Sequence, residues 1–126
     1  MEFIIFMEEE ICIKKGKEKI MLSVQKQSFF DMGRGLLFYS REKAPILIFH
    51  STHPKLDAIH SFFLFFDFLA IWLDKNNNIL EVRKIKPWQI HLNHDGDWKK
   101  LIEIPISERY DDKIKLIVGG AKGLNR

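Results

Sequence analysis

The sequence is poor in the features that mark several large classes of protein. It has one cysteine, Cys12, among 126 residues, and one thiol supports neither an internal disulfide framework nor a cysteine-based zinc site. Its longest apolar stretch, 61–73, is interrupted by Asp67 and is shorter than the ~20 residues of a membrane-spanning helix. The N-terminal run MEFIIFMEEE lacks the positive residues of a signal peptide. We expect no membrane partner and a cytoplasmic location, where single thiols stay reduced.

Neither sign of charge dominates the chain. Twenty Lys+Arg against 17 Asp+Glu give a formal net charge of +3, and there is no basic arm or acidic tail. Nucleic acid is therefore not the expected partner. The hydrophobic fraction of 46% excludes a disordered chain, and the length suits one domain over residues 1–126.

Short apolar runs separated by turn residues predict a mainly β fold. We expect a small single-domain barrel or sandwich of about eight short strands with one or two short helices. The runs expected to form strands are Glu2–Met7, Ile11–Lys14, 20–25, Ile46–Phe49, Ile59–Phe66, Phe68–Leu73, Ile79–Lys86, Leu101–Ile104 and Ile114–Val118. Ser28 and Ser107 are the expected N-caps of two short helical turns. Lys15–Lys17 and Asp74–Asn78 are expected turns.

Several segments together resemble one known family. They are the run IHSFFLFFDFLAIWLDKNNNILEVRKIKPW, the strands PILIF and LIEIP, the end IKLIVGG, and Arg34-Gly35-Leu36-Leu37-Phe38. In order and spacing they resemble the family catalogued as domain of unknown function number 192, above all its archaeal members. The resemblance covers residues 18–120, leaving 1–17 as an extra N-terminal strand pair and 121–126 as a tail. It implies a compact, mainly β domain with no named activity.

The chain departs from that family before its long central strand. The family's Pro-x-Asp is replaced by Asp67, Phe68 and Leu69, and Ser61 replaces a methionine after His60. If the family's aspartate carries chemistry, either this chain lacks it or Asp67 substitutes from two positions earlier. A two-residue shift along a strand keeps the same face, so the substitution is geometrically allowed.

Two His-x-x-His pairs raise the question of a metal site. They are His50 with His53 and His91 with His94, and Asp57, Asp95 and Asp97 lie near them in the sequence. Imidazole and carboxylate groups bind zinc or manganese. Both pairs fall in loops, however, where their side chains would not be held on one helix face. We expect solvated loops, no metal and no cofactor.

Five phenylalanines between Phe62 and Phe68 could line a ligand pocket or a base-stacking platform. In a small β domain, such density is more typical of the core. The segment 83–88, Arg-Lys-Ile-Lys-Pro-Trp, places cations beside an aromatic ring that could hold an anion or stack on a base.

The leading interpretation is a binding or accessory module with a ligand site formed by Arg34, His60, Lys86 and Trp88. Two alternatives stay open. One is a small, metal-assisted enzyme in which His60 is the general base and Asp57 or Asp67 orients it. The other is a weak nucleic-acid binder through residues 83–88. The edge strands of the expected sheet also allow a homodimer.

Overall fold

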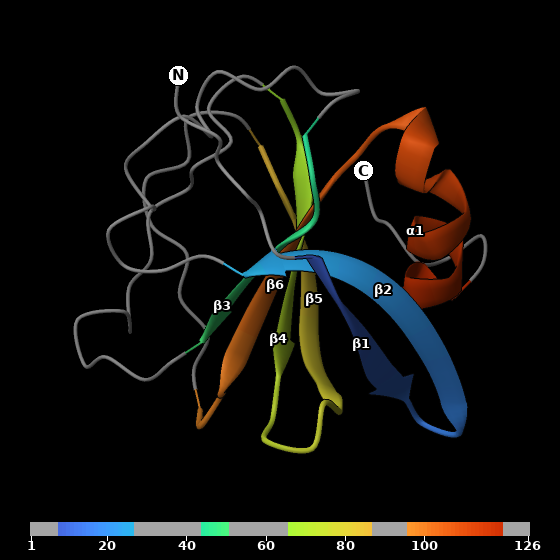
Figure 1. The fold of residues 1–126 in the computed structure, drawn as a ribbon. Coiled ribbons are helices and arrows are strands. Elements are labelled where there is room, and N and C mark those ends of the chain that lie inside the picture. Colours follow the sequence, from blue (N-terminus) through green and yellow to red (C-terminus); the bar gives the residue numbers. More distant parts are fainter. Residues whose placement is uncertain (1–7, 27–43, 51–65, 87–95, 120–126) are drawn as a thin grey trace.

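The computed structural model describes residues 8–26, 44–50, 66–86 and 96–119, which form one six-stranded sheet with a short helix at its side (Figure 1). The spatial order of the strands is β1-β2-β3-β6-β4-β5. Their bounds are β1 Glu8–Lys15, β2 Glu18–Lys26, β3 Leu47–His50, β4 Phe68–Leu73, β5 Ile79–Ile85 and β6 Lys100–Pro105. The prediction of a mainly β fold is confirmed.

The first two strands form an antiparallel hairpin. Gly16 turns it with a φ of 61°, a left-handed conformation that suits glycine. Along β2 the side chains alternate as predicted: Ile20 and Leu22 are buried, whereas Met21 is exposed. In Figure 1 the hairpin bends away from the other four strands, and β2 keeps only a short parallel pairing with β3.

The hairpin of β4 and β5 is closed by a side chain. Asp74 accepts hydrogen bonds from the backbone N–H groups of Asn76 and Asn78 at 2.8 and 2.9 Å, and Asn77 has a φ of 66°. The N–H of Lys14 donates to the carbonyl of Asn77 at 2.8 Å. The sheet curls into a half-barrel, and this bond joins β1 to the turn before β5.

The two faces of the sheet bury separate clusters. The inner cluster lies on the face that α1 covers, and it takes residues from β1, β2, β3, β4 and β6. The outer cluster lies on the opposite face and takes residues from β3, β4, β5 and β6, but none from the first hairpin. Adjacent residues of one strand therefore enter different clusters: Trp72 belongs to the outer one, and Ile71 to the inner one.

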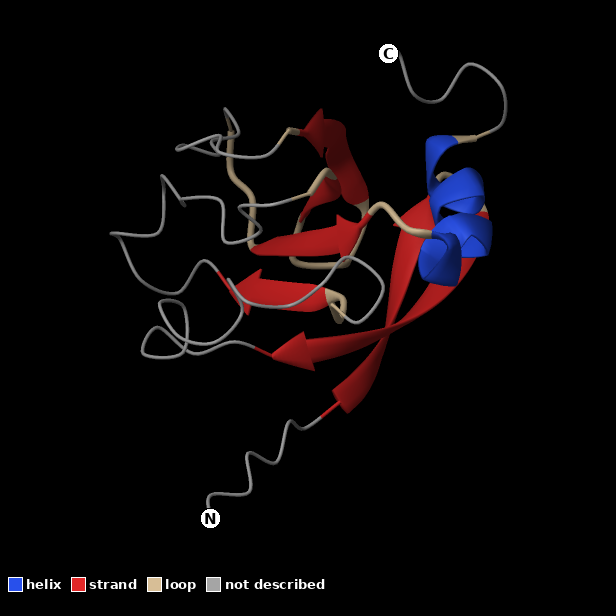
Figure 2. Cartoon of the chain, turned by 90° about the horizontal axis from the view of Figure 1, so that it is seen from above, coloured by secondary structure: helices blue, strands red, loops and turns tan. Residues whose placement is uncertain are grey.

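A 3₁₀ turn, η4 (Glu108–Tyr110), leads directly into helix α1 (Asp111–Val118). The helix packs Ile114 and Ile117 into the inner cluster, and Figure 2 shows it beside the long crossing strands of the first hairpin. Gly119 ends it with a φ of 77° and an N–H donated to the carbonyl of Lys115.

The predicted strand at Ile114–Val118 is wrong, because this segment is helical. A strand would bury Ile114, Leu116 and Val118 on one face. Instead, the buried pair is Ile114 and Ile117, at helical spacing, while Leu116 is 48% exposed. Acidic residues in the first turn and a glycine just past the end favour a helix here.

A second difference concerns the first strand. Glu8–Glu10, predicted as a break between two strands, belong to β1, and β1 pairs with β2. The predicted strands at Ile46–Phe49, Phe68–Leu73, Ile79–Lys86 and Leu101–Ile104 are confirmed within a residue or two at each end. The helical turn after Ser107 is confirmed as well, and Ser107 holds the N-cap position, but its hydroxyl makes no capping hydrogen bond. Glu2–Met7, the turn after Ser28 and most of Ile59–Phe66 lie outside the described residues.

Candidate functional site

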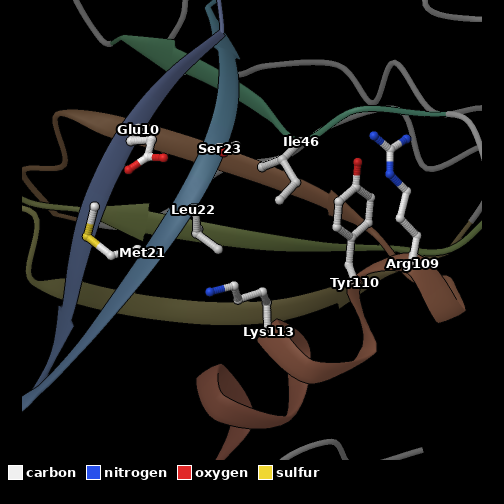
Figure 3. Close-up of a pocket in the computed structure, with 8 residues that line it drawn as sticks. All are labelled: Glu10, Met21, Leu22, Ser23, Ile46, Arg109, Tyr110 and Lys113. Carbon is white, nitrogen blue, oxygen red and sulfur yellow. The ribbon is translucent and has the colours of Figure 1, made fainter.

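A pocket of about 280 Å³ opens where β2 separates from the segment leading into β3. One wall comes from the first hairpin, and the other from Ile46 and the η4–α1 segment (Figure 3). The lining residues are Glu10, Met21, Leu22, Ser23, Ile46, Arg109, Tyr110 and Lys113. Its volume lies just below the ~300–1,000 Å³ of ordinary ligand pockets, so a ligand here would be small.

Three charged side chains line this pocket. Arg109 and Lys113 come from η4 and α1, and Glu10 comes from β1 on the opposite wall. In Figure 3, Lys113 extends from the helix toward β2. Two cations in the lining of one pocket favour an anionic ligand group, and the Lys113 ammonium offers three donors to it.

The middle of the pocket is apolar. Met21, Leu22 and Ile46 contribute aliphatic or thioether surface, and Met21 is 45% exposed although it is a large apolar side chain. The ring of Tyr110 lies between Ile46 and Arg109 in Figure 3. Its hydroxyl donates to the carbonyl of Ala44 at 2.9 Å, which fixes the ring. The guanidinium of Arg109 lies over that ring at 5.1 Å from the centroid.

A second unusual group lies outside the pocket, at the centre of the sheet. Glu103 is fully buried in β6, and neither carboxyl oxygen has a hydrogen-bond partner within the described residues. Its neighbours across the sheet are Leu47 on β3 and Ala70 on β4. Burial raises the pKa of Glu103 to about 8, so the carboxyl is protonated at neutral pH.

The predicted basic segment is largely neutralised. The Nε of Arg83 donates to the Glu81 carboxylate at 2.8 Å, and its guanidinium lies 4.7 Å from the centroid of the Trp72 ring. Lys84 pairs with Asp67 at 3.2 Å. Lys86, which the sequence placed in a ligand site, is exposed just after β5.

Asp67 lies at the start of β4, where the resembled family has its proline. Its ion-pair partner Lys84 faces Leu69 across the β4–β5 ladder. Asp67 therefore lies on the same side of the sheet as Leu69, as the two-residue shift predicts. The ion pair gives Asp67 a structural partner.

Most of the other predicted site residues lie outside the described residues. These are Arg34, His60, Trp88, Asp57, Asp95, His53, His91 and His94. Asp97 is exposed and pairs with Lys99 at 3.2 Å. His50 is half-buried at the end of β3. Within the described ranges, no group of three or more His, Cys, Asp or Glu side chains could hold a metal ion. In those same ranges, no helix is long and apolar enough to cross a membrane.

Comparison with known proteins gives two relatives. A UPF0127 protein of Thermococcus sibiricus is 27% identical over 97 residues, or 75% of this chain and 62% of that protein. A UPF0127 protein of Pyrococcus horikoshii is 30% identical over 94 residues, or 70% of this chain and 81% of that protein. The chain belongs to the UPF0127 family. It spans less than two thirds of the length of the T. sibiricus relative.

UPF0127 is an uncharacterised family, and neither relative is named for an activity. The predicted membership of a family without a known function is therefore confirmed. No protein-family model and no solved structure matches the chain. The function of this UPF0127 member must therefore be argued from its own residues.

Sequence reasoning missed every residue of the pocket in this UPF0127 chain. Arg109 and Lys113 are four residues apart, and they line one cavity because η4 continues into α1 and puts both on the same side of a helical path. A short turn followed by a strand at Ile114–Val118, as the sequence predicts, does not give this arrangement. Glu103 did carry a signal, since it is a lone glutamate inside the apolar run LIEIP.

Proposed function

We propose that this protein is a binding module for a small amphipathic acid, which it holds in the pocket between the first hairpin and the η4–α1 segment. The observation that carries the proposal is the meeting of two cations, Arg109 and Lys113, with an apolar wall in one cavity of about 280 Å³. An apolar cavity with a few convergent polar groups is the usual form of a small-molecule site.

Lys113 is the main anchor for the acidic group. It is half-buried, and it is in no ion pair within the described part of the chain. The next lysine along the helix, Lys115, pairs with Asp111 at 3.0 Å. A carboxylate on Lys113 would gain a charge-assisted hydrogen bond at a site partly removed from water. Arg109 lines the same pocket on the other side of the Tyr110 ring and adds a second cation to its wall.

The ligand's apolar part would shield Met21, which is 45% exposed. Leu22 and Ile46 are nearly fully buried, and they form the apolar floor beside Met21 in the same pocket. Apolar burial contributes about 25 cal/mol per Å². A branched chain of four or five carbons is therefore a suitable partner for this wall.

Calorimetric titration of the full chain with 4-methylpentanoate tests this function. We expect saturable binding that Lys113→Ala weakens about tenfold, the effect of losing one charge-assisted hydrogen bond. Lys75→Ala, an exposed lysine in the β4–β5 turn, removes the same charge and should leave the affinity unchanged. Equal weakening by both variants would show non-specific attraction and contradict the proposal, as would absence of binding.

The ligand site of Arg34, His60, Lys86 and Trp88 stays a prediction, as do the single domain over 1–126, the homodimer and the enzymatic alternative using His60. The nucleic-acid alternative has less support, because Arg83 and Lys84 are both in ion pairs. We further propose that the UPF0127 relatives and the family of domain of unknown function number 192 are one group. A cytoplasmic location is also proposed; Cys12, a free thiol in β1, suits a reducing compartment.

A further inference from the structure

We infer that the ligand of this pocket is a zwitterion, an apolar α-amino acid whose carboxylate binds Lys113 and whose ammonium binds Glu10. This inference rests on the proposed function and names the chemical class of its ligand. It depends on Glu10, a carboxylate that lines the pocket from the wall opposite the helix.

Glu10 and Lys113 line the same pocket from opposite walls. Glu10 is on β1, Lys113 is on α1, and Figure 3 shows the first hairpin and the helix facing each other across the cavity. Neither side chain is in an ion pair within the described ranges. Two opposite charges that share a cavity without meeting are complementary to a molecule that carries both charges.

A polar group on the hairpin adds to the ammonium end of the site. Ser23 is the cross-strand partner of Glu10 in the β1–β2 ladder and also lines the pocket. Directly paired residues in a ladder have Cβ atoms about 5 Å apart. The carboxylate of Glu10 and the hydroxyl of Ser23 can therefore accept from one ammonium group, which has three donors.

The remaining wall decides the side chain of the amino acid. Met21, Leu22 and Ile46 offer no hydrogen-bond partner, so a polar ligand side chain would lose its hydration there without compensation. The pocket volume of about 280 Å³ limits the ligand to a small molecule. Leucine meets both conditions, and 4-methylpentanoate is the same molecule without its amino group.

Calorimetric titrations with L-leucine and 4-methylpentanoate, on the full chain at pH 7, isolate the contribution of the ammonium. We expect leucine to bind about fivefold more tightly, as suits an ion pair to an exposed carboxylate. Glu10→Gln should bring the ratio of the two affinities to about one. Glu9→Gln removes the same charge from an exposed neighbour that does not line the pocket, and should preserve the ratio.

The outcomes separate this inference from the proposed function. If leucine binds no more tightly than 4-methylpentanoate while Lys113→Ala still weakens the acid, the zwitterion is refuted and the acid site stands. If Glu9→Gln and Glu10→Gln lower the ratio of the leucine and 4-methylpentanoate affinities equally, the effect comes from the overall charge of the hairpin and not from a contact with Glu10. The zwitterion is then refuted as well. If neither compound binds, both proposals fail.

Discussion

Glu103 and Arg83 lie in one row across the outer face of the sheet, with Ala70 between them. Ala70 pairs with Glu103 on β6 and with Arg83 on β5. Neighbouring strands are about 4.8 Å apart, so the two backbones are separated by roughly twice that spacing. Arg83 is instead bonded to Glu81 on its own strand. The carboxyl of Glu103 therefore has no cationic partner within the described residues, and its burial keeps it protonated at neutral pH.

This placement predicts a stability that falls as the pH rises. The pKa of Glu103 is raised from its ordinary 4.5 to about 8, so between these values the folded state holds a proton that the unfolded state releases. The contribution of Glu103 is thus fully present below pH 4.5 and is lost toward pH 8, with a slope of about 1.4 kcal/mol per pH unit. Glu103→Gln, which cannot ionise, should remove this slope.

Urea unfolding of the wild type and Glu103→Gln between pH 5 and 9 measures the effect as a difference between two proteins. The variant should gain stability relative to the wild type as the pH rises, and the gain should level off above pH 8. Glu108→Gln, an exposed glutamate in η4, is the matched control and should show no such trend. A difference for Glu103→Gln that is constant with pH would contradict the burial of a neutral carboxyl.

The helix at Asp111–Val118 predicts a specific pattern of sensitivity to alanine. Ile117→Ala should lower the free energy of unfolding by about 2–4 kcal/mol, because Ile117 is 1% exposed within the inner cluster. Leu116→Ala on the exposed side of the same helix should change it by less than about 0.5 kcal/mol. The reverse order, in chemical denaturation of both variants, would favour the strand that the sequence pattern predicts.

Tyr110→Phe tests the wall of the pocket. The variant loses the hydrogen bond from the hydroxyl to the Ala44 carbonyl but keeps the ring under Arg109. We expect a loss of about 1 kcal/mol in unfolding free energy and a weaker affinity for 4-methylpentanoate, because the ring is less firmly fixed. Thermal melting and calorimetry measure the two effects, and full stability in the variant would show that this bond does not form.

The β4–β5 turn depends on a single ionised side chain. Hydrogen bonds from Asn78 and Asn76 lower the pKa of Asp74, so its contribution is present at neutral pH and is lost as the pH falls through that lowered value. Asp74→Ala should lower the melting temperature at pH 7 and remove this part of the acid sensitivity. Asp97→Ala removes the same charge from an exposed position before β6 and should lower the melting temperature less. Equal losses in the two variants would argue against closure of the turn by Asp74.

Most strands could be predicted because each is a short apolar run between residues with turn chemistry. Pro45 precedes β3, and Asp74–Asn78 connect β4 to β5. The last element could not be predicted, since the apolar residues at 114, 116, 117 and 118 fit both strand and helix periods. Contact with the inner cluster decides for the helix, as Ile114 and Ile117 are the two that it buries.

The pocket was beyond prediction for a related reason. Its lining residues, at 10, 21–23, 46 and 109–113, are distant in the sequence. They meet because β2 bends away from β3 and η4 returns beside it. Alternation along β2 does predict that Met21 and Ser23 face away from the core, but it does not predict that the η4–α1 segment lies across from them. The family resemblance indicates residues 34, 60 and 88 as site residues, and it does not indicate Arg109.

Backbone amide NMR of the labelled chain, titrated with 4-methylpentanoate, is the most direct test of the ligand pocket. We expect saturable shift changes concentrated at Glu10, Met21–Ser23, Ile46 and Arg109–Lys113, and their loss in Lys113→Ala. Saturable changes confined to β4 and β5, or none at all, would contradict a ligand pocket between the first hairpin and helix α1.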